Sequence, residues 1–156
     1  MQDVTLEYHP GSFILLRGTV LRGCLSFAQL RPQDPEGGGL LLGQYKEGGH
    51  IDISAYTTPQ PEDTRRRCFF FRQSRKHSEK AIKAWVCSDH TVTWCGEWHT
   101  HPEDHPTPSL LDLNQWNENM KNGLPMVAMI IGRKSCWVGI TGPEGIIPLE
   151  QRLLYE

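Results

Sequence analysis

This sequence of 156 residues lacks any apolar run of the ~18 residues that a membrane-spanning helix needs. Its longest apolar stretches, such as Met126 to Ile131, are only as long as a strand. The first residues include Asp3 and Glu7, so the basic start and apolar middle of a secretory signal are missing. The sequence therefore predicts a cytoplasmic protein that does not bind a membrane.

Cysteine is scarce, and its spacing excludes two kinds of site. The five cysteines are an odd number, and no two lie closer than eight residues: Cys24, Cys68, Cys87, Cys95 and Cys136. No CxxC zinc ribbon or redox motif is present, and a disulfide framework is not expected. Each cysteine is expected to be a small buried apolar residue in a reducing compartment.

Net charge is also low. The formal charge is −2 at pH 7, so the whole chain has no electrostatic attraction for nucleic acid or anionic lipid. One basic patch comprises Arg65, Arg66 and Arg67, followed by Arg72, Arg75 and Lys76. A nucleic-acid site requires a basic domain as well as a basic stretch. We interpret the patch as a solvated strand edge and helix start, or as a contact for a partner protein.

Apolar periodicity predicts a single globular domain over residues 1–156. Helices are predicted at 19–30, 78–87 and 109–121, and strands at 13–16, 39–45, 50–57, 68–72, 91–101, 126–131, 136–141 and 146–149. The two strands around Glu47-Gly48-Gly49 are expected to form a hairpin, the strand at 68–72 to be buried, and Ala81, Ile82, Trp85 and Val86 to share one helical face. The predicted class is α+β, with a mixed, mostly antiparallel central sheet flanked by helices.

The segment from Trp98 to Asp112 contains the residue types of a metal site. Side chains two apart on a strand share a face, so His99 and His101 can present two imidazoles to one ion. After a loop with three prolines, Thr107 could serve as the N-cap and Pro108 as the first residue of a helix. Ser109 and Asp112 would then share a helical face and look back at the histidines.

Two neutral imidazoles and one carboxylate form the ligand set of a catalytic zinc site, whose fourth position holds water. The pKa of such a water can fall to about 7. Each feature alone has a plainer interpretation. His-x-His can be a surface or packing feature, Ser109 to Asp112 resembles a capping box, and Glu36 can be an exposed loop carboxylate.

Jointly, His-x-His, seven residues, Ser, two residues and Asp resemble the signature of the JAMM (MPN-plus) metalloproteases. The segment Glu36 to Gly43 also matches that family's upstream pattern Glu-x-x-Gly-x-Leu-x-Gly. The resemblance implies the MPN fold over most of the chain. It implies one Zn²⁺ per chain bound by His99, His101 and Asp112, with Glu36 as general acid and base. It assigns Ser109 to polarising the scissile carbonyl and stabilising the oxyanion.

Four further residues lie near this signature. Glu97 shares the strand face of the histidines, and we expect it to support the site, with the alternative that it is the base. His105 is expected to be an exposed loop residue, with the alternatives that it contacts substrate or replaces a ligand. Trp98 and Trp116 are expected to pack around the site.

Among JAMM proteins, the segments Gly96 to Glu103 and Pro108 to Asp112 are more similar to stand-alone bacterial members than to eukaryotic deubiquitinases. They resemble the peptidase of CBASS antiphage operons. That enzyme accompanies an E1–E2-like ligase and removes a cGAS-like nucleotidyltransferase from the targets to which its C-terminus is joined. The resemblance therefore implies an isopeptidase whose substrate is such a C-terminal tail. Gly123 leads within three residues into the next predicted strand, so no insertion that would bring a second zinc is expected there.

Two other functions stay open. One is a housekeeping JAMM peptidase that processes a ubiquitin-like or sulfur-carrier protein, and the other is a non-catalytic MPN scaffold. The scaffold is disfavoured because such modules lose the ligands. A zinc deaminase is disfavoured because no Pro-Cys-x-x-Cys follows the histidines. Site chemistry does not separate the two peptidases, because surfaces outside the site select the substrate.

Overall fold

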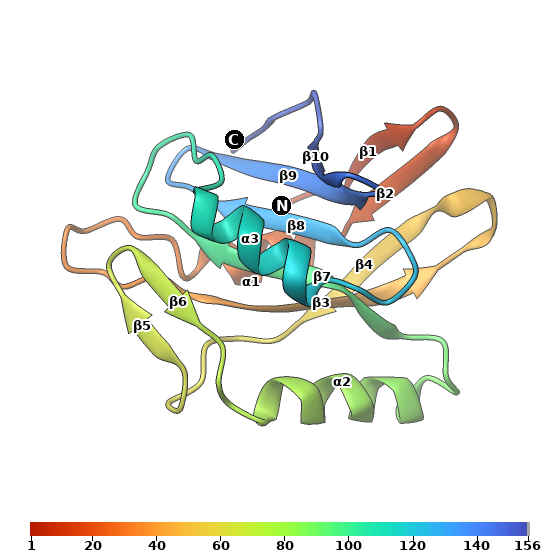
Figure 1. The fold of residues 1–156 in the computed structure, drawn as a ribbon, viewed down its shortest axis with the longest axis horizontal. Helices are drawn as coiled ribbons and strands as arrows, with labels where there is room; N and C mark the ends of the chain where they lie inside the picture. Colours follow the sequence, from red (N-terminus) through yellow and green to blue (C-terminus); the bar gives the residue numbers. More distant parts are fainter. Residues whose placement is uncertain (156) are drawn as a thin grey trace.

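The computed structural model describes residues 1–155, which fold around one nine-stranded sheet (Figure 1). Its strands are β1 (Val4–His9), β2 (Ser12–Leu16), β3 (Gly38–Tyr45), β4 (Ile51–Tyr56), β7 (Thr93–Thr100), β8 (Val127–Ile131), β9 (Ser135–Gly142), β10 (Gly145–Pro148) and β11 (Leu153–Leu154). Their order is β1-β2-β4-β3-β7-β8-β9-β10, with β11 beside β9. The pairs β2–β4 and β7–β8 are parallel and the others antiparallel. The predicted mixed, mostly antiparallel sheet is confirmed.

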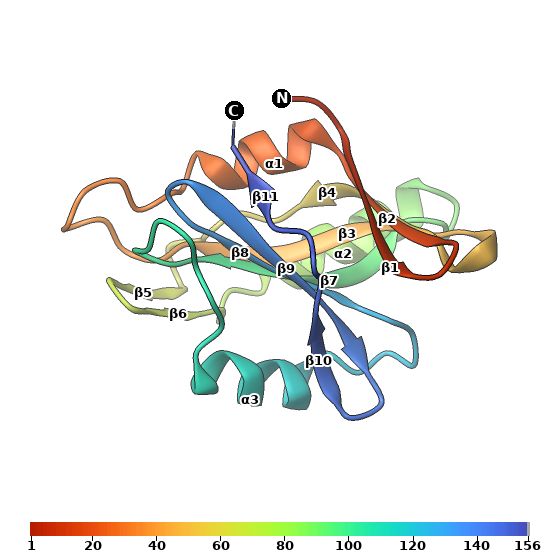
Figure 2. The ribbon, with the colours of Figure 1, turned by 90° about the horizontal axis from the view of Figure 1, so that it is seen from above.

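Two helices cover opposite faces of this sheet (Figure 2). Helix α1 (Gly18–Leu25) buries Val20 and Cys24 in the larger core. Helix α3 (Leu110–Asn119) buries Trp116 in a smaller core on the other face. All five residues of β8 are buried because both of its faces are covered. The neighbouring β7, which contains His99 and ends directly before His101, lies in the middle of the sheet.

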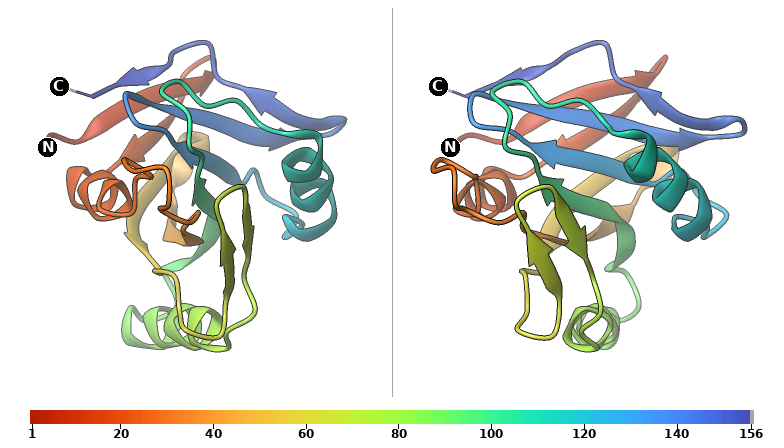
Figure 3. Two further views of the ribbon diagram at one scale, coloured as in Figure 1. Left: turned by 90° about the vertical axis from the view of Figure 1, so that its left-hand side faces the viewer. Right: turned by 60° about the vertical axis from the view of Figure 1, so that its left-hand side comes forward.

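A two-stranded hairpin of β5 (Thr64–Arg66) and β6 (Phe69–Phe71) is separate from the main sheet and leads into helix α2 (Lys76–Cys87; Figure 3). The prediction of a buried strand at 68–72 is wrong. The strand is shorter, and Phe71 is 45% exposed, because β6 pairs only with β5. The predicted hairpin of β3 and β4 is confirmed by their antiparallel pairing.

The apolar face predicted for α2 is not buried. Ile82 and Val86 are more than half exposed, and His77 is the buried residue of this helix. His77 Nε2 lies 2.6 Å from Asp63 Oδ2, and His77 Nδ1 lies 2.5 Å from Thr57 Oγ1. A polar network at its N-terminal end therefore anchors α2, while its apolar stripe faces outward.

Glycines in the segment Glu36 to Gly43 have a steric role. A Cβ atom on Gly39 would collide with the carbonyl of Thr57, and one on Gly43 would collide with the carbonyl of Asp52. Leu41, between them, is fully buried in the larger core. Because Gly39 and Gly43 have no side chain, β3 can lie close to β4 and to Thr57 directly after it. This close packing holds in place the strand that follows Glu36.

Other expectations are only partly confirmed. Helix α1 ends at Leu25 rather than Leu30, because the following turns bring Gln29 into a buried hydrogen bond with Thr100, 2.8 Å long. Cys24, Cys95 and Cys136 are buried as expected, but Cys68 and Cys87 are exposed; all five are free thiols. Within residues 1–155, none of the helices combines the length and hydropathy of a membrane span.

Candidate metal centre

His99 lies near the end of β7 and His101 directly follows its last residue, and the Nε2 atoms of the two histidines are 3.1 Å apart. Asp112 in the first turn of α3 faces both, with Oδ1 3.3 Å from His99 Nε2 and Oδ2 3.1 Å from His101 Nε2. Three donor atoms bound to one tetrahedral zinc at ~2.1 Å would lie ~3.4 Å from one another. The spacing of the two nitrogens and the carboxylate is therefore compatible with one metal ion shared by the three side chains, and the zinc that the sequence pattern predicts stays a prediction.

A capping box fixes the Asp112 side chain. The Ser109 side chain accepts the Asp112 N–H at 3.1 Å, and Asp112 Oδ2 accepts the Ser109 N–H at 2.8 Å. The prediction of Thr107 as N-cap and Pro108 as first helical residue is wrong, because this reciprocal pair makes Ser109 the N-cap. The resemblance of Ser109 to Asp112 to a capping box is confirmed, and the box orients the carboxylate toward the histidines.

Glu36 shares one cavity of about 260 Å³ with the three candidate ligands and Ser109. Glu36 is 5% exposed. It lies two residues before Gly38, which pairs with His99 where β3 lies beside β7. The main chain of Glu36 is held on both sides: its N–H donates to Arg66 O, and its carbonyl accepts from Arg65 Nε, both at 2.8 Å.

Burial raises the pKa of the Glu36 carboxyl to about 8; the positive charge of His101 opposes this effect, and Asp112 and Glu103 add to it. A cation held by the neighbouring ligands would lower this pKa. A carboxyl whose pKa is near neutrality can accept a proton and return it at neutral pH. Glu36 therefore has the burial and position of a general acid and base.

The imidazole of His101 is oriented by a second carboxylate. His101 Nδ1 lies 2.8 Å from Glu103 Oε1, which leaves Nε2 facing Asp112. Burial alone would lower the pKa of His101, but its hydrogen bonds to Asp112 and Glu103 outweigh burial and raise it. Burial would raise the pKa of Asp112, but bonds to His101 and His99 hold that pKa far below its usual range.

Sequence reasoning missed Glu103 as a supporting residue. A carboxylate that accepts from the far nitrogen of a ligand histidine fixes its tautomer and orientation. The available signal was its position two residues after His101, just past the end of β7.

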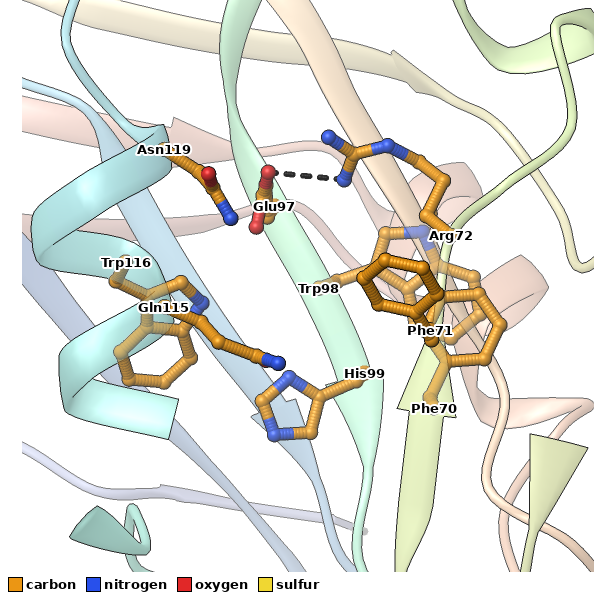
Figure 4. A pocket seen from close by; sticks show the side chains of 10 residues that line it. Phe70, Phe71, Arg72, Glu97, Trp98, His99, Gln115, Trp116 and Asn119 are labelled. Atoms are coloured by element: carbon orange, nitrogen blue, oxygen red, sulfur yellow. Dashed lines mark hydrogen bonds and ion pairs between the residues drawn. The ribbon is translucent and has the colours of Figure 1, made fainter. Parts of the chain in front are cut away.

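Glu97 lies on the same face of β7 but is paired with Arg72, whose Nη1 is 2.8 Å from Glu97 Oε1. Figure 4 shows the Arg72–Glu97 pair at one end of a small pocket and His99 at its other end. One side of this pocket is formed by β6, through Phe70 and Phe71. The other side is formed by α3, through Gln115, Trp116 and Asn119. Glu97 thus joins the hairpin to the sheet, which agrees with a supporting role.

Trp98 and Trp116 are buried on opposite sides of the sheet, and the Trp116 ring lies 5.4 Å from the His99 ring. His105 is exposed, bonds Ser135 Oγ through Nδ1 at 2.8 Å, and is not among the residues that line the cavity.

Comparison with known proteins agrees with this architecture. The family described as prokaryotic homologs of the JAB domain matches residues 25–141, which contain every candidate site residue. The chain is 36% identical over 141 residues to the CD-NTase/cGAS isopeptidase of Vibrio cholerae, covering 89% of this chain and 90% of that one. It is 38% identical over 120 residues to the CD-NTase/cGAS isopeptidase of Pseudomonas aeruginosa, covering 75% of each chain.

The fold also resembles a solution structure of a Desulfitobacterium hafniense protein, with a TM-score of 0.60 and 19% identity over 85% of this chain and 87% of that one. That likeness concerns the fold alone. The family match and the identity to the two isopeptidases extend over most of the chain. This chain belongs to the prokaryotic JAB family.

Proposed function

We propose that this protein is a zinc-dependent isopeptidase that releases a cGAS-like nucleotidyltransferase from the proteins to which its C-terminus is joined. The observation that carries the proposal is the convergence of His99, His101 and Asp112 at 3.1–3.3 Å beside a buried Glu36. The naming of both relatives as CD-NTase/cGAS isopeptidases supports the substrate class. An E1–E2-like ligase that makes the bond would be a partner of the same system.

His99, His101 and Asp112 would hold one Zn²⁺ per chain through two imidazole nitrogens and a carboxylate. When bound there, zinc supplies a Lewis acid and lowers the pKa of a coordinated water to about 7. Glu103 keeps the Nε2 atom of His101 available by accepting from Nδ1. The capping box keeps the Asp112 carboxylate from rotating away.

Glu36 would accept the proton of the attacking water and return it to the leaving amine. Burial raises the pKa of its carboxyl, so the ionised form, which a bound cation would favour, accepts a proton more readily than an exposed carboxylate. Its main chain cannot shift without breaking two hydrogen bonds to the hairpin. A proton donor held in one place is worth more to a reaction than a mobile one, because no reorganisation is needed in the transition state.

Ser109 would donate a hydrogen bond to the scissile carbonyl oxygen. Its oxygen accepts the Asp112 N–H, so its own hydroxyl proton stays available to a second partner. The residue is exposed and lies on the wall of the cavity. A donor aimed at the developing oxyanion can lower the barrier by about 3 kcal/mol.

The substrate would lie between the hairpin and α3. The cavity has apolar walls from Phe69 and Phe70 on one side and Leu111 on the other. Such walls suit an extended chain end whose polar backbone faces the metal centre. A scaffold role is disfavoured, because every ligand side chain is retained and oriented.

The test is cleavage of a fusion that joins a nucleotidyltransferase C-terminus to a reporter protein. We expect a cut after the terminal nucleotidyltransferase residue, loss of the cut with chelator, and recovery with zinc. A matched fusion with a sulfur-carrier C-terminus serves as the control. Preferential cleavage of that control would favour the housekeeping peptidase and contradict the proposal.

A further inference from the structure

The loop of residues 102–108 joins two candidate ligands, His101 and Asp112, and has no regular secondary structure. It contains three prolines, which have no N–H to donate to neighbouring strands. The loop must nevertheless keep His101 Nε2 and Asp112 Oδ2 3.1 Å apart. Its own hydrogen bonds supply little of that rigidity, so contacts from other parts of the chain must hold it.

The first half of the loop is held by the turn between β8 and β9. Arg133 N donates to Glu103 O at 2.8 Å, and Lys134 N donates to Asp104 O at 2.9 Å. Arg133 Nε also pairs with Asp104 Oδ1 at 2.8 Å. These contacts end at Asp104, before the second and third prolines.

The second half is held by a residue from the end of the chain. Arg152 Nη1 donates to Pro106 O at 3.1 Å and to Ser135 Oγ at 3.3 Å. The same Ser135 Oγ lies 2.8 Å from His105 Nδ1. Ser135 is fully buried and Pro106 is buried, so these oxygens depend on protein partners.

Strand β11 places Arg152 beside the loop. Leu154 pairs with Ser135, so the end of the chain returns along β9 (Figure 2). Tyr155 reinforces this position, because its hydroxyl donates to Ser135 O at 2.9 Å. Arg152 lies beyond residues 25–141, which are the part matched to the family. The family match therefore does not account for this contact.

We propose that Arg152 is a positioning residue for the metal centre. Through Pro106 and Ser135 it fixes the loop that sets the spacing of His101 and Asp112. Without it, an ion would have to order the loop on binding, and that lost conformational freedom weakens binding. This inference rests on the proposed function, because it concerns the ion that the three ligands would hold.

The experiment measures zinc affinity by competition with a chromophoric chelator, and unfolding of the metal-free protein by urea. We expect Arg152→Ala to weaken zinc binding about 10-fold, at the lower end of the effect of residues that bond ligands directly. Arg152→Lys, which keeps one donor group, should weaken it less. The metal-free Arg152→Ala protein should unfold at the same urea concentration as the metal-free control variant, Arg17→Ala.

Arg17→Ala is the matched control. Arg17 also makes paired hydrogen bonds, to Asp52 at 3.0 and 2.8 Å, but it lies at the start of α1 and away from the metal centre. It should lower stability and leave zinc affinity unchanged. The inference would be overturned if Arg152→Ala bound zinc as tightly as the unaltered protein. It would also be overturned if Arg152→Ala and Arg17→Ala lost the same amount of zinc affinity. If Arg152→Ala does not fold, Arg152→Lys supplies the same comparison. Failure of the unaltered protein to bind zinc would instead refute the proposed function.

Discussion

Glu36 shows how burial, main-chain restraint and charge act together at one residue. Its carboxyl is buried among groups that would bind a cation, and its main chain is bonded to the hairpin through Arg65 and Arg66. Glu97, the rival for the same role, is neutralised by Arg72 at 2.8 Å. Glu36 lines the cavity of the three candidate ligands, whereas Glu97 is not among its lining residues.

Replacing Glu36 by Gln keeps the shape of the side chain but removes its ability to carry a proton. We expect zinc content near one per chain, measured by atomic absorption, and a 10²- to 10⁴-fold loss of kcat in the fusion assay, the range typical of general acid–base catalysis. Glu97→Gln is the control and should keep most of the activity. The reverse pattern would show that the base has been misassigned.

The ligand residues should behave differently from Glu36. His99→Ala, His101→Ala or Asp112→Ala removes a donor atom and should lower zinc content as well as activity. Glu103→Gln should keep the metal but weaken its binding by about 10- to 100-fold, because Glu103 only orients His101. Full zinc content after any one ligand replacement would argue against that residue as a ligand.

Ser109 caps helix α3 and also lines the cavity of the candidate metal centre. Ser109→Ala removes both the cap and the hydroxyl, and should cost about 1 kcal/mol of unfolding free energy. Ser109→Gly removes the hydroxyl but costs only a few tenths of a kcal/mol at an N-cap. Both variants should lose kcat by about 10²- to 10³-fold if the hydroxyl stabilises the oxyanion. Recovery of activity in Ser109→Gly would assign the residue to capping alone.

Local spacing explains which parts of the site could be predicted from sequence. His99 and His101 converge because a strand repeats every two residues, and Ser109 and Asp112 pair because a helical turn separates them. No local rule brings Glu36 to them, and only the similarity to a family motif predicted its place. The resemblance to the JAMM family, and the α+β class with it, is confirmed.

The wrong predictions concern elements whose state depends on distant contacts. The apolar pattern of α2 is real, but Asp63 and Thr57 anchor the helix through His77 and leave that pattern exposed. The start of α3 depends on whether Thr107 or Ser109 caps the helix, and the reciprocal hydrogen bonds with Asp112 select Ser109. Neither outcome follows from periodicity. The extent of the domain over residues 1–156, the zinc ion and the ligase partner stay predictions.

The titratable groups of the site should make the free energy of unfolding of the whole protein depend on pH. In the metal-free protein, burial raises the pKa of Glu36 to about 8, and bonds to Asp112 and Glu103 outweigh burial to raise that of His101. A raised pKa in the folded state gives stability that is lost as pH rises through the folded value. The depressed pKa of Asp112 gives stability that is lost as pH falls below its usual ~3.9.

The metal-free protein should therefore lose stability between pH 6 and about 8, as measured by its urea midpoint. With zinc the trend should reverse, because the ion displaces the proton of His101 and binds more tightly as that proton leaves. His101→Gln should weaken both trends. A metal-free midpoint that rises over the same range would contradict the charge arrangement described for the site.

Diffraction from a crystal of the zinc-loaded protein, measured at the zinc absorption edge, would locate the metal relative to His99, His101 and Asp112. We expect one anomalous peak per chain, ~2.0–2.2 Å from His99 Nε2, His101 Nε2 and an Asp112 oxygen, with Glu36 beside it. No peak at that position, or a peak held by other residues, would contradict the assignment of these three residues as ligands.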